Sequence, residues 1–95
     1  MDINIQHDQK NHKFTVTIEG SECYLNYNLP RSNVIDFYFT YVPRELRGRG
    51  IAALLVEEGL KYAEKNKLQV IPGCSYVNIY IHRHENYMGL LKSDK

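Results

Sequence analysis

The chain has 95 residues, of which 43% are hydrophobic and 24% are charged, so we expect one folded domain of ordinary globular composition. Twelve lysines and arginines against eleven aspartates and glutamates give a formal net charge of +1, which argues against a nucleic-acid-binding domain. No apolar leader opens the chain and no run approaches the roughly 18 apolar residues of a membrane span, so we expect a cytoplasmic protein without a membrane partner.

The first half of the chain predicts three antiparallel strands. Residues 14–18 alternate between apolar and polar side chains, and residues 23–29 alternate again, so the two segments are typical of a hairpin. Residues 1–12 are expected to be flexible or to form a short edge strand. The face of the second strand that is expected to be buried carries Cys23, Leu25, Tyr27 and Leu29.

Residues 34–42 predict the third strand, which Pro43 ends because proline cannot donate to a sheet. Its apolar face is expected to carry Ile35, Phe37, Phe39 and Tyr41, and its other face carries Asp36, Tyr38 and Thr40.

The second half changes its period. Residues 49–65 predict an amphipathic helix with Leu54 in its apolar stripe, and Asn66 is a plausible stop. Residues 68–72 predict a short buried strand, and a shorter helix is expected to open at Ser75, a favoured N-cap type. A tail follows, flexible over residues 89–95. The order predicts a single α+β domain over residues 1–95.

The segment Arg47-Gly48-Arg49-Gly50 places two poor helix formers directly before a helix. The first helical N–H groups lack intrahelical partners, the helix dipole is positive there, and glycines let an anion approach the backbone. A solvated loop is the alternative interpretation, and one copy without repeats argues against an RNA-binding segment. The turn matches neither the P-loop nor the dinucleotide fingerprint.

Cys74 is expected at the start of the second helix, where the pKa of a thiol is lowered. It is therefore a candidate nucleophile, and a small buried side chain is the alternative. Cys23 lies far away in sequence, so neither a disulfide nor a metal site is implied. His82 and His84 are two residues apart and do not face each other on a helix; we therefore expect no metal.

Residues 47–52, Arg-Gly-Arg-Gly-Ile-Ala, resemble the acetyl-CoA signature Q/R-x-x-G-x-G/A of the GCN5-related N-acetyltransferase (GNAT) superfamily. Together with "LQVIPGCSYVNIYIHRHENY" they resemble its very small single-domain members. The resemblance implies a minimal fold with a mostly antiparallel sheet, in which the strands at 34–42 and 68–72 splay apart. It also implies transfer of an acetyl group from acetyl-CoA to a primary amine by direct attack on the thioester. The acceptor, a protein or a small molecule, stays open, as does a homodimer.

The resemblance also implies a placement for acetyl-CoA. The pyrophosphate would lie on the amides of residues 47–52, the pantetheine arm would pass the end of the third strand, and the thioester would lie near Cys74. The candidate catalytic residues are Cys74 (as nucleophile or as neighbour of the thioester), Tyr80 as donor to the CoA sulfur and His84 as base. Aromatic packing against the sheet is the alternative for Tyr80, and a solvated or core-edge position is the alternative for His84. The implied cofactor-binding residues are Tyr41, Val42, Arg44, Arg47, Gly48, Arg49, Gly50, Ile51, Ala52, Gly73, Cys74 and Tyr80.

The chain departs from the small members at one point. They often read His-Thr-x-Val-Pro with an acid at x, whereas this chain has Phe39 and Tyr41 at those two positions. The roles of that histidine and acid therefore cannot be transferred, and Asp36 and Glu85 are the fallback bases. This departure motivates the alternative function, a non-catalytic module that binds CoA or acetyl-CoA.

Overall fold

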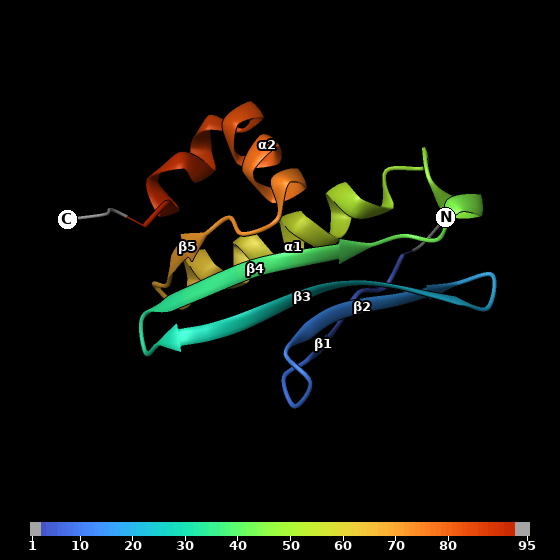
Figure 1. Ribbon diagram of the computed structural model, residues 1–95, viewed down its shortest axis with the longest axis horizontal. Helices are drawn as coiled ribbons and strands as arrows, with labels where there is room; N and C mark the ends of the chain where they lie inside the picture. The colour runs from blue at the N-terminus through green and yellow to red at the C-terminus, as the bar shows by residue number, and fades with distance from the viewer. Residues whose placement is uncertain (1–2, 93–95) are drawn as a thin grey trace.

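The computed structural model describes residues 3–92 as one five-stranded sheet with helices packed against it (Figure 1). The sheet order is β1-β2-β3-β4-β5, antiparallel through β4, with β5 parallel to β4. This confirms the α+β class and the mostly antiparallel sheet. The elements are β1 (Gln6–Asp8), β2 (Lys13–Ile18), β3 (Ser21–Arg31), β4 (Val34–Tyr41), η1 (Arg44–Leu46), α1 (Ile51–Lys65), β5 (Gln69–Ile71), α2 (Ser75–Arg83) and η2 (Glu85–Leu90).

Residues 6–8 form the short edge strand β1, one of the two possibilities expected for the start of the chain. Two elements go beyond the expected order, since 3₁₀ helices precede α1 and follow α2. The expected tail bends back, because Leu91 bridges to Val70 in β5 and the Lys92 N–H donates to the Val70 carbonyl at 2.9 Å. The flexibility expected at the two ends concerns, in part, residues 1–2 and 93–95, which lie outside the described residues.

The hairpin of β2 and β3 follows the predicted alternation. Glu19 and Gly20 form its two-residue turn with φ of 52° and 80°, as the twist of a tight hairpin requires. Cys23, Leu25 and Tyr27 are buried as expected, but Leu29 is 45% exposed. A register shift between Asn28 and Arg31 explains this difference, because it interrupts the alternation just where Leu29 lies.

A β-bulge in β4 overturns part of the predicted face. Tyr27 pairs with Phe37 while its neighbour Asn26 pairs with Phe39, so Tyr38 is an extra residue. Beyond a bulge the alternation is inverted. Phe39 and Tyr41 therefore lie on the face opposite to the buried Phe37, contrary to the prediction. The face of the sheet that packs on α1 is called the inner face below, and the opposite face is the outer face.

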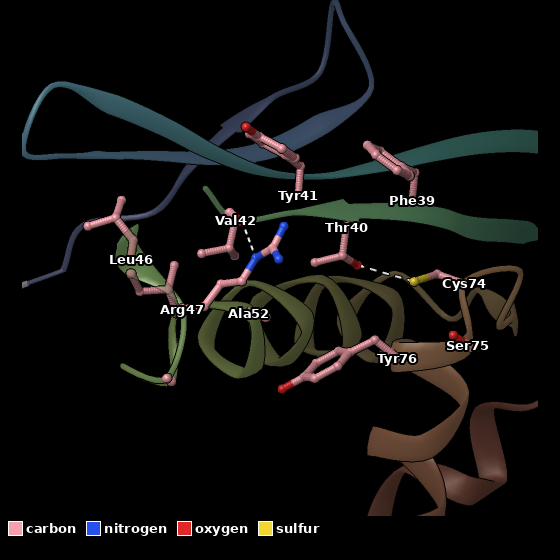
Figure 2. Close-up of a pocket in the computed structure, with 13 residues that line it drawn as sticks. Phe39, Thr40, Tyr41, Val42, Leu46, Arg47, Ala52, Cys74, Ser75 and Tyr76 are labelled. Carbon is pink, nitrogen blue, oxygen red and sulfur yellow. Dashed lines mark hydrogen bonds between the residues drawn. The ribbon is translucent and has the colours of Figure 1, made fainter. Parts of the chain in front are cut away.

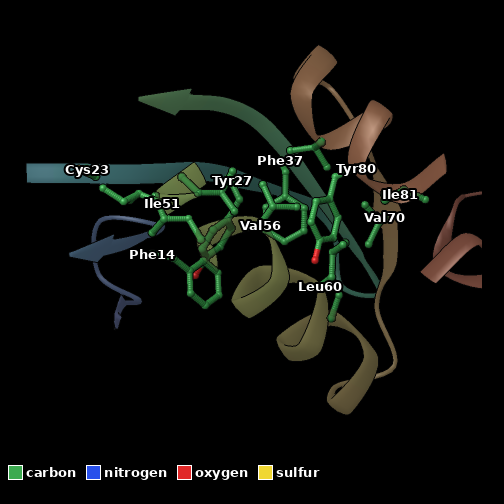
Figure 3. Packing of buried hydrophobic residues seen from close by; sticks show 14 of the residues in the cluster. Phe14, Cys23, Tyr27, Phe37, Ile51, Val56, Leu60, Val70, Tyr80 and Ile81 are labelled. Carbon is green, nitrogen blue, oxygen red and sulfur yellow. The ribbon is translucent and has the colours of Figure 1, made fainter. Parts of the chain in front are cut away.

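Helix α1 packs across the inner face, and its buried residues join one core with side chains of the sheet and of α2 (Figure 3). Gly59 explains the close approach, because a Cβ there would lie 2.9 Å from the Phe37 ring. Asn66 ends the helix as predicted, and its side-chain amide donates to the Tyr62 carbonyl at 2.8 Å. Leu54, predicted in the apolar stripe, is 38% exposed, since the stripe is narrower than the run of apolar residues.

A cluster of rings packs near the C-terminal part of α1. His7 stacks on Phe14 at 4.1 Å between ring centroids, and its Nε2 lies 2.6 Å from the Tyr27 hydroxyl. The edge of the Tyr62 ring packs on His7 at 4.5 Å, and His12 stacks on the Tyr27 ring. Burial lowers the pKa of His7 and raises the pKa of Tyr27 to about 12.

Candidate active site

The candidate site lies where β4 and β5 separate. Their pairing ends at Asp36 and Ile71, and the Cys74 N–H then donates to the Phe37 carbonyl at 2.9 Å. A Cβ at Gly73 would lie 2.5 Å from Asp36 Oδ1 and 3.3 Å from the Tyr38 Cα. Glycine therefore lets the chain lie against β4 before it turns away into α2, and the second half of β4 is left without a neighbour on this side.

A pocket of about 670 Å³ opens at this separation (Figure 2). Three segments line it: the end of β4, the glycine turn with the first residues of α1, and the start of α2. Its lining residues are Phe39, Thr40, Tyr41, Val42, Leu46, Arg47, Gly48, Gly50, Ile51, Ala52, Cys74, Ser75 and Tyr76.

The glycine turn leads directly into α1. Gly48 and Gly50 have φ of 85° and 80°, a conformation that L side chains rarely adopt, and no atom lies within 4 Å of a Cβ built on either. Gly50 is the N-cap of α1, and its carbonyl accepts the first helical bond from the Leu54 N–H at 3.2 Å. The amides of residues 51–53, which come before this first bond, therefore point out of the open and positively polarised N-terminal end of the helix.

Cys74 lies at the other end of the pocket. It is itself the N-cap of α2, so the predicted N-cap Ser75 is instead the first helical residue. Its Sγ lies 3.5 Å from the Thr40 hydroxyl. Burial raises the pKa of the thiol, but the hydrogen bonds from Thr40 and from the amides of Val77 and Tyr76 outweigh it, so the pKa of Cys74 is lowered.

The three arginines expected at the phosphate site take different positions. Arg47 lines the pocket, and its Nε–H donates to the Val42 carbonyl at 2.9 Å (Figure 2). Arg49 points to the β2–β3 turn, where it forms an ion pair of 2.8 Å with Glu19. Arg44 is exposed in η1 and is not part of the pocket lining.

Two of the expected catalytic residues lie away from the pocket lining. Tyr80 is 9% exposed and packs into the core between α1 and α2 (Figure 3). Its ring stacks on His84 at 3.9 Å, and burial raises its pKa. His84 Nδ1 donates to the Tyr80 carbonyl at 2.8 Å, if that nitrogen carries the proton. The tyrosine of α2 that lines the pocket is Tyr76, one turn earlier.

The structure thus brings together most of the expected binding residues. These are Tyr41, Val42, Arg47, Gly48, Gly50, Ile51, Ala52 and Cys74. Arg44, Arg49, Gly73, Tyr80 and His84 are outside the lining.

No binding or catalytic role was predicted for Thr40, the hydrogen-bond partner of Cys74, nor for Leu46 and Ser75. Only their position in the sequence could have indicated that they line the pocket. Each is next to a residue that was predicted to bind the cofactor: Tyr41, Arg47 and Cys74.

Among residues 3–92 no group of three or more histidine, cysteine, aspartate or glutamate side chains is arranged to hold a metal ion. Both cysteines are free. Over the same described range no helix is long and apolar enough to cross a membrane.

Comparisons with known proteins agree on the class of this fold. A solution NMR structure of a protein described as GCN5-like, from Staphylococcus aureus, superposes with a TM-score of 0.75 over 97% of this chain and 90% of that one, at 21% identity. The fold is therefore the GNAT fold in a compact form. A family model described as GCN5-related N-acetyl-transferase matches residues 13–90. The chain belongs to the GCN5-related N-acetyltransferases.

Curated relatives point the same way. The chain is 32% identical to Protein NATD1 of Gallus gallus over 81 residues, covering 83% of this chain and 74% of that protein. It is 31% identical to Protein NATD1 of Homo sapiens, with coverage of 83% and 72%. Membership of the family implies acetyl-CoA as the co-substrate and acetyl transfer as the class of reaction.

Proposed function

We propose that the protein is an acetyl-CoA-dependent N-acetyltransferase that moves an acetyl group to a primary amine by direct attack on the thioester. The observation that supports this most is the single pocket that joins the glycine turn at the start of α1 to Cys74 at the start of α2. An anion-binding end and a titratable thiol in one pocket suit a ligand with a phosphate part and a reactive thioester.

The residues of the pocket fit acetyl-CoA. Gly48 and Gly50 leave open space beside the backbone, so a pyrophosphate can approach the amides at the start of α1. Arg47 lies at the same mouth and adds positive charge. The unpaired second half of β4, with Tyr41 and Val42, lies along the path to Cys74 and is the proposed position of the pantetheine arm.

The proposed reaction assigns one role to Cys74. The amine nitrogen bonds to the acetyl carbon, the carbon–sulfur bond breaks, and the CoA sulfur keeps the electron pair and takes one proton. A second proton leaves the acceptor ammonium. Cys74 accepts that proton in its thiolate form, which the lowered pKa favours and the Thr40 hydrogen bond stabilises, and then passes the proton to solvent. Tyr80 and His84 are left out, since they lie outside the pocket lining.

Thermal unfolding with acetyl-CoA and with CoA tests the binding step. A ligand at 100 times its Kd stabilises the folded state by about 2.7 kcal/mol, which raises the midpoint by on the order of 10 °C for a domain of this size. Gly50→Val is expected to abolish the rise. The matched control is Gly20→Val, because Gly20 has the same φ of 80° and the same open surroundings but lies outside the pocket lining. Equal rises in both variants would contradict the proposed phosphate site.

Turnover with a panel of amines tests the transfer step. Acetylated amine and free CoA thiol should appear in equal amounts, and intact-mass spectra should show no acetylated Cys74. A clear thermal rise without any turnover would favour the non-catalytic CoA-binding module, which the aromatic residues Phe39 and Tyr41 motivate. An acetyl group on Cys74 that is passed to amines would replace direct attack with a covalent route.

A further inference from the structure

Three aromatic rings lie together on the outer face of the sheet. The Tyr24 ring lies 5.4 Å from the Tyr41 ring and 6.1 Å from the Phe39 ring, measured between centroids. Phe39 is 45% exposed and Tyr41 is 38% exposed, although aromatic rings gain most from burial. We call Tyr24, Phe39 and Tyr41 the aromatic shelf. The bulge at Tyr38 produces it, because the bulge turns Phe39 and Tyr41 away from the core.

The aromatic shelf borders the pocket. Phe39 and Tyr41 line the pocket together with Thr40 and Cys74, which lie on the α1 side of β4. Figure 2 shows the rings of Phe39 and Tyr41 on the opposite side of β4 from the Thr40 side chain and α1. A molecule on the shelf can therefore reach the Cys74 end of the pocket from the outer face of the sheet. The inner face is covered by α1.

A lysine of the chain itself already lies on this shelf. The Lys13 ammonium lies 5.4 Å from the centroid of the Tyr24 ring and 2.9 Å from a carboxylate oxygen of Glu22. Lys13 on β2 pairs with Asn26 on β3, which pairs with Phe39 on β4. Lys13 therefore lies in register, across the sheet, with a residue that lines the pocket. The negative face of an aromatic ring attracts an ammonium group, and Lys13 shows this contact on the shelf.

We propose that the aromatic shelf binds the acceptor as an alkylammonium, and that this acceptor is a lysine side chain of a polypeptide. This rests on the proposed function. The shelf is an open strand surface, whereas small-molecule sites usually bury most of their ligand in a cavity. An extended chain can lie across such a surface and place one lysine stem along the rings of Phe39 and Tyr41, with its amine toward the pocket.

The test titrates a short peptide, capped at both ends and carrying one central lysine, into the protein saturated with CoA, and follows the ring signals by NMR. The Kd should rise two- to fivefold in Phe39→Leu and in Tyr41→Leu, and about tenfold in the double variant. Tyr38→Leu is the matched control, because Tyr38 is 44% exposed on the same strand but lines neither pocket nor shelf, and it should leave the Kd unchanged. Lys13→Gln should lower the Kd about twofold, since it frees the Tyr24 ring.

Three comparisons decide the proposal. A peptide with norleucine in place of lysine should bind at least tenfold more weakly; equal binding would overturn recognition of the ammonium. Tighter binding of 1,5-diaminopentane than of the lysine peptide would overturn the polypeptide source. An unchanged Kd in the double variant would overturn the shelf. The thermal rise with acetyl-CoA, measured on the unsubstituted protein, reports the proposed cofactor site, so its absence counts against the proposed function; the peptide titration, repeated without CoA, then judges the shelf.

Discussion

The two halves of β4 both carry aromatic residues, but these residues lie in different environments. In the first half, Val34 and Ile35 lie between β3 and β5, Phe37 follows this pairing directly, and none of the three is more than 1% exposed. In the second half β5 has left, a bulge has inverted the alternation, and Phe39 and Tyr41 are exposed. Aromatic residues thus build the core where a strand has two neighbours, and they line a pocket where it has one.

The largest test of this contrast removes one ring from each half. Phe37→Ala should lower the free energy of unfolding by about 3–5 kcal/mol, as expected for a fully buried phenylalanine; Phe37 is 0% exposed. Phe39→Ala should lower the free energy of unfolding by less than about 1 kcal/mol, because the Phe39 ring is half exposed. Urea denaturation measures both values. Equal losses would mean that the two halves contribute alike to the core.

The next test acts at the junction of the halves. Gly73→Ala should cost about 1–3 kcal/mol by overpacking, because the new Cβ would lie 2.5 Å from Asp36 Oδ1. Asp36→Ala should reduce that cost in a double-mutant cycle. Gly89→Ala is the control, since nothing lies within 4 Å of a Cβ there. A Gly73→Ala variant as stable as the control would show that β5 does not need this close contact.

A smaller effect, a change in the pKa of Cys74, is expected from a substitution in the second half of β4. Thr40→Val keeps the shape of the side chain but removes the hydrogen bond that helps to lower the pKa of Cys74. The pKa of Cys74 should therefore rise, and the midpoint of its alkylation rate against pH should move upward. Cys74→Ala identifies the signal, because Cys23 is 0% exposed. An unmoved midpoint would assign the lowered pKa to the backbone amides alone.

The smallest effect concerns the buried half and its supporting rings. Phe14 and Tyr27 pack on both Phe37 and His7. Burial lowers the pKa of His7, Asp8 raises it and His12 lowers it further. The folded state therefore prefers neutral His7, so stability is fully present above the unfolded-state pKa near 6.5 and is lost as pH falls below it.

Thermal midpoints between pH 8 and 5 measure this loss. His7→Phe keeps a ring on Phe14 and should flatten the part of the slope that His7 causes. The rise in midpoint with acetyl-CoA should be the same in both proteins at pH 7, because His7 lies outside the pocket lining. An unchanged slope in His7→Phe would assign the pH dependence to other groups.

The sequence could predict the parts of the fold that repeat. Alternation over residues 14–18 and the helical period over residues 49–65 both follow from which face is buried, so both elements are confirmed, with the helix beginning two residues later, at Ile51. The bulge in β4 could not be predicted, since Phe37, Tyr38, Phe39 and Tyr41 make both faces aromatic and either register looks plausible. A period identifies an element, but it does not reveal where pairing stops.

The site shows the same limit. The glycine turn and Cys74 were identified because each has a local signal, namely poor helix formers before a helix and a thiol at a helix start. Tyr76 and Tyr80 are four residues apart and share a side of α2, yet one lines the pocket and the other packs in the core. One helical turn of about 5.4 Å separates them along the axis, and sequence spacing does not say which turn meets the ligand.

The extra residue at Tyr38 has a genetic consequence. Deleting that one codon is expected to remove the bulge without turning the strand over, because Phe39 would follow Phe37 directly and keep its pairing with Asn26. Phe39 and Tyr41 would stay on the outer face and Thr40 would stay beside Cys74. One residue inserted between Phe39 and Thr40 should instead turn Thr40 outward and Tyr41 toward α1, so this strand should tolerate the loss of Tyr38 better than a gain beyond it.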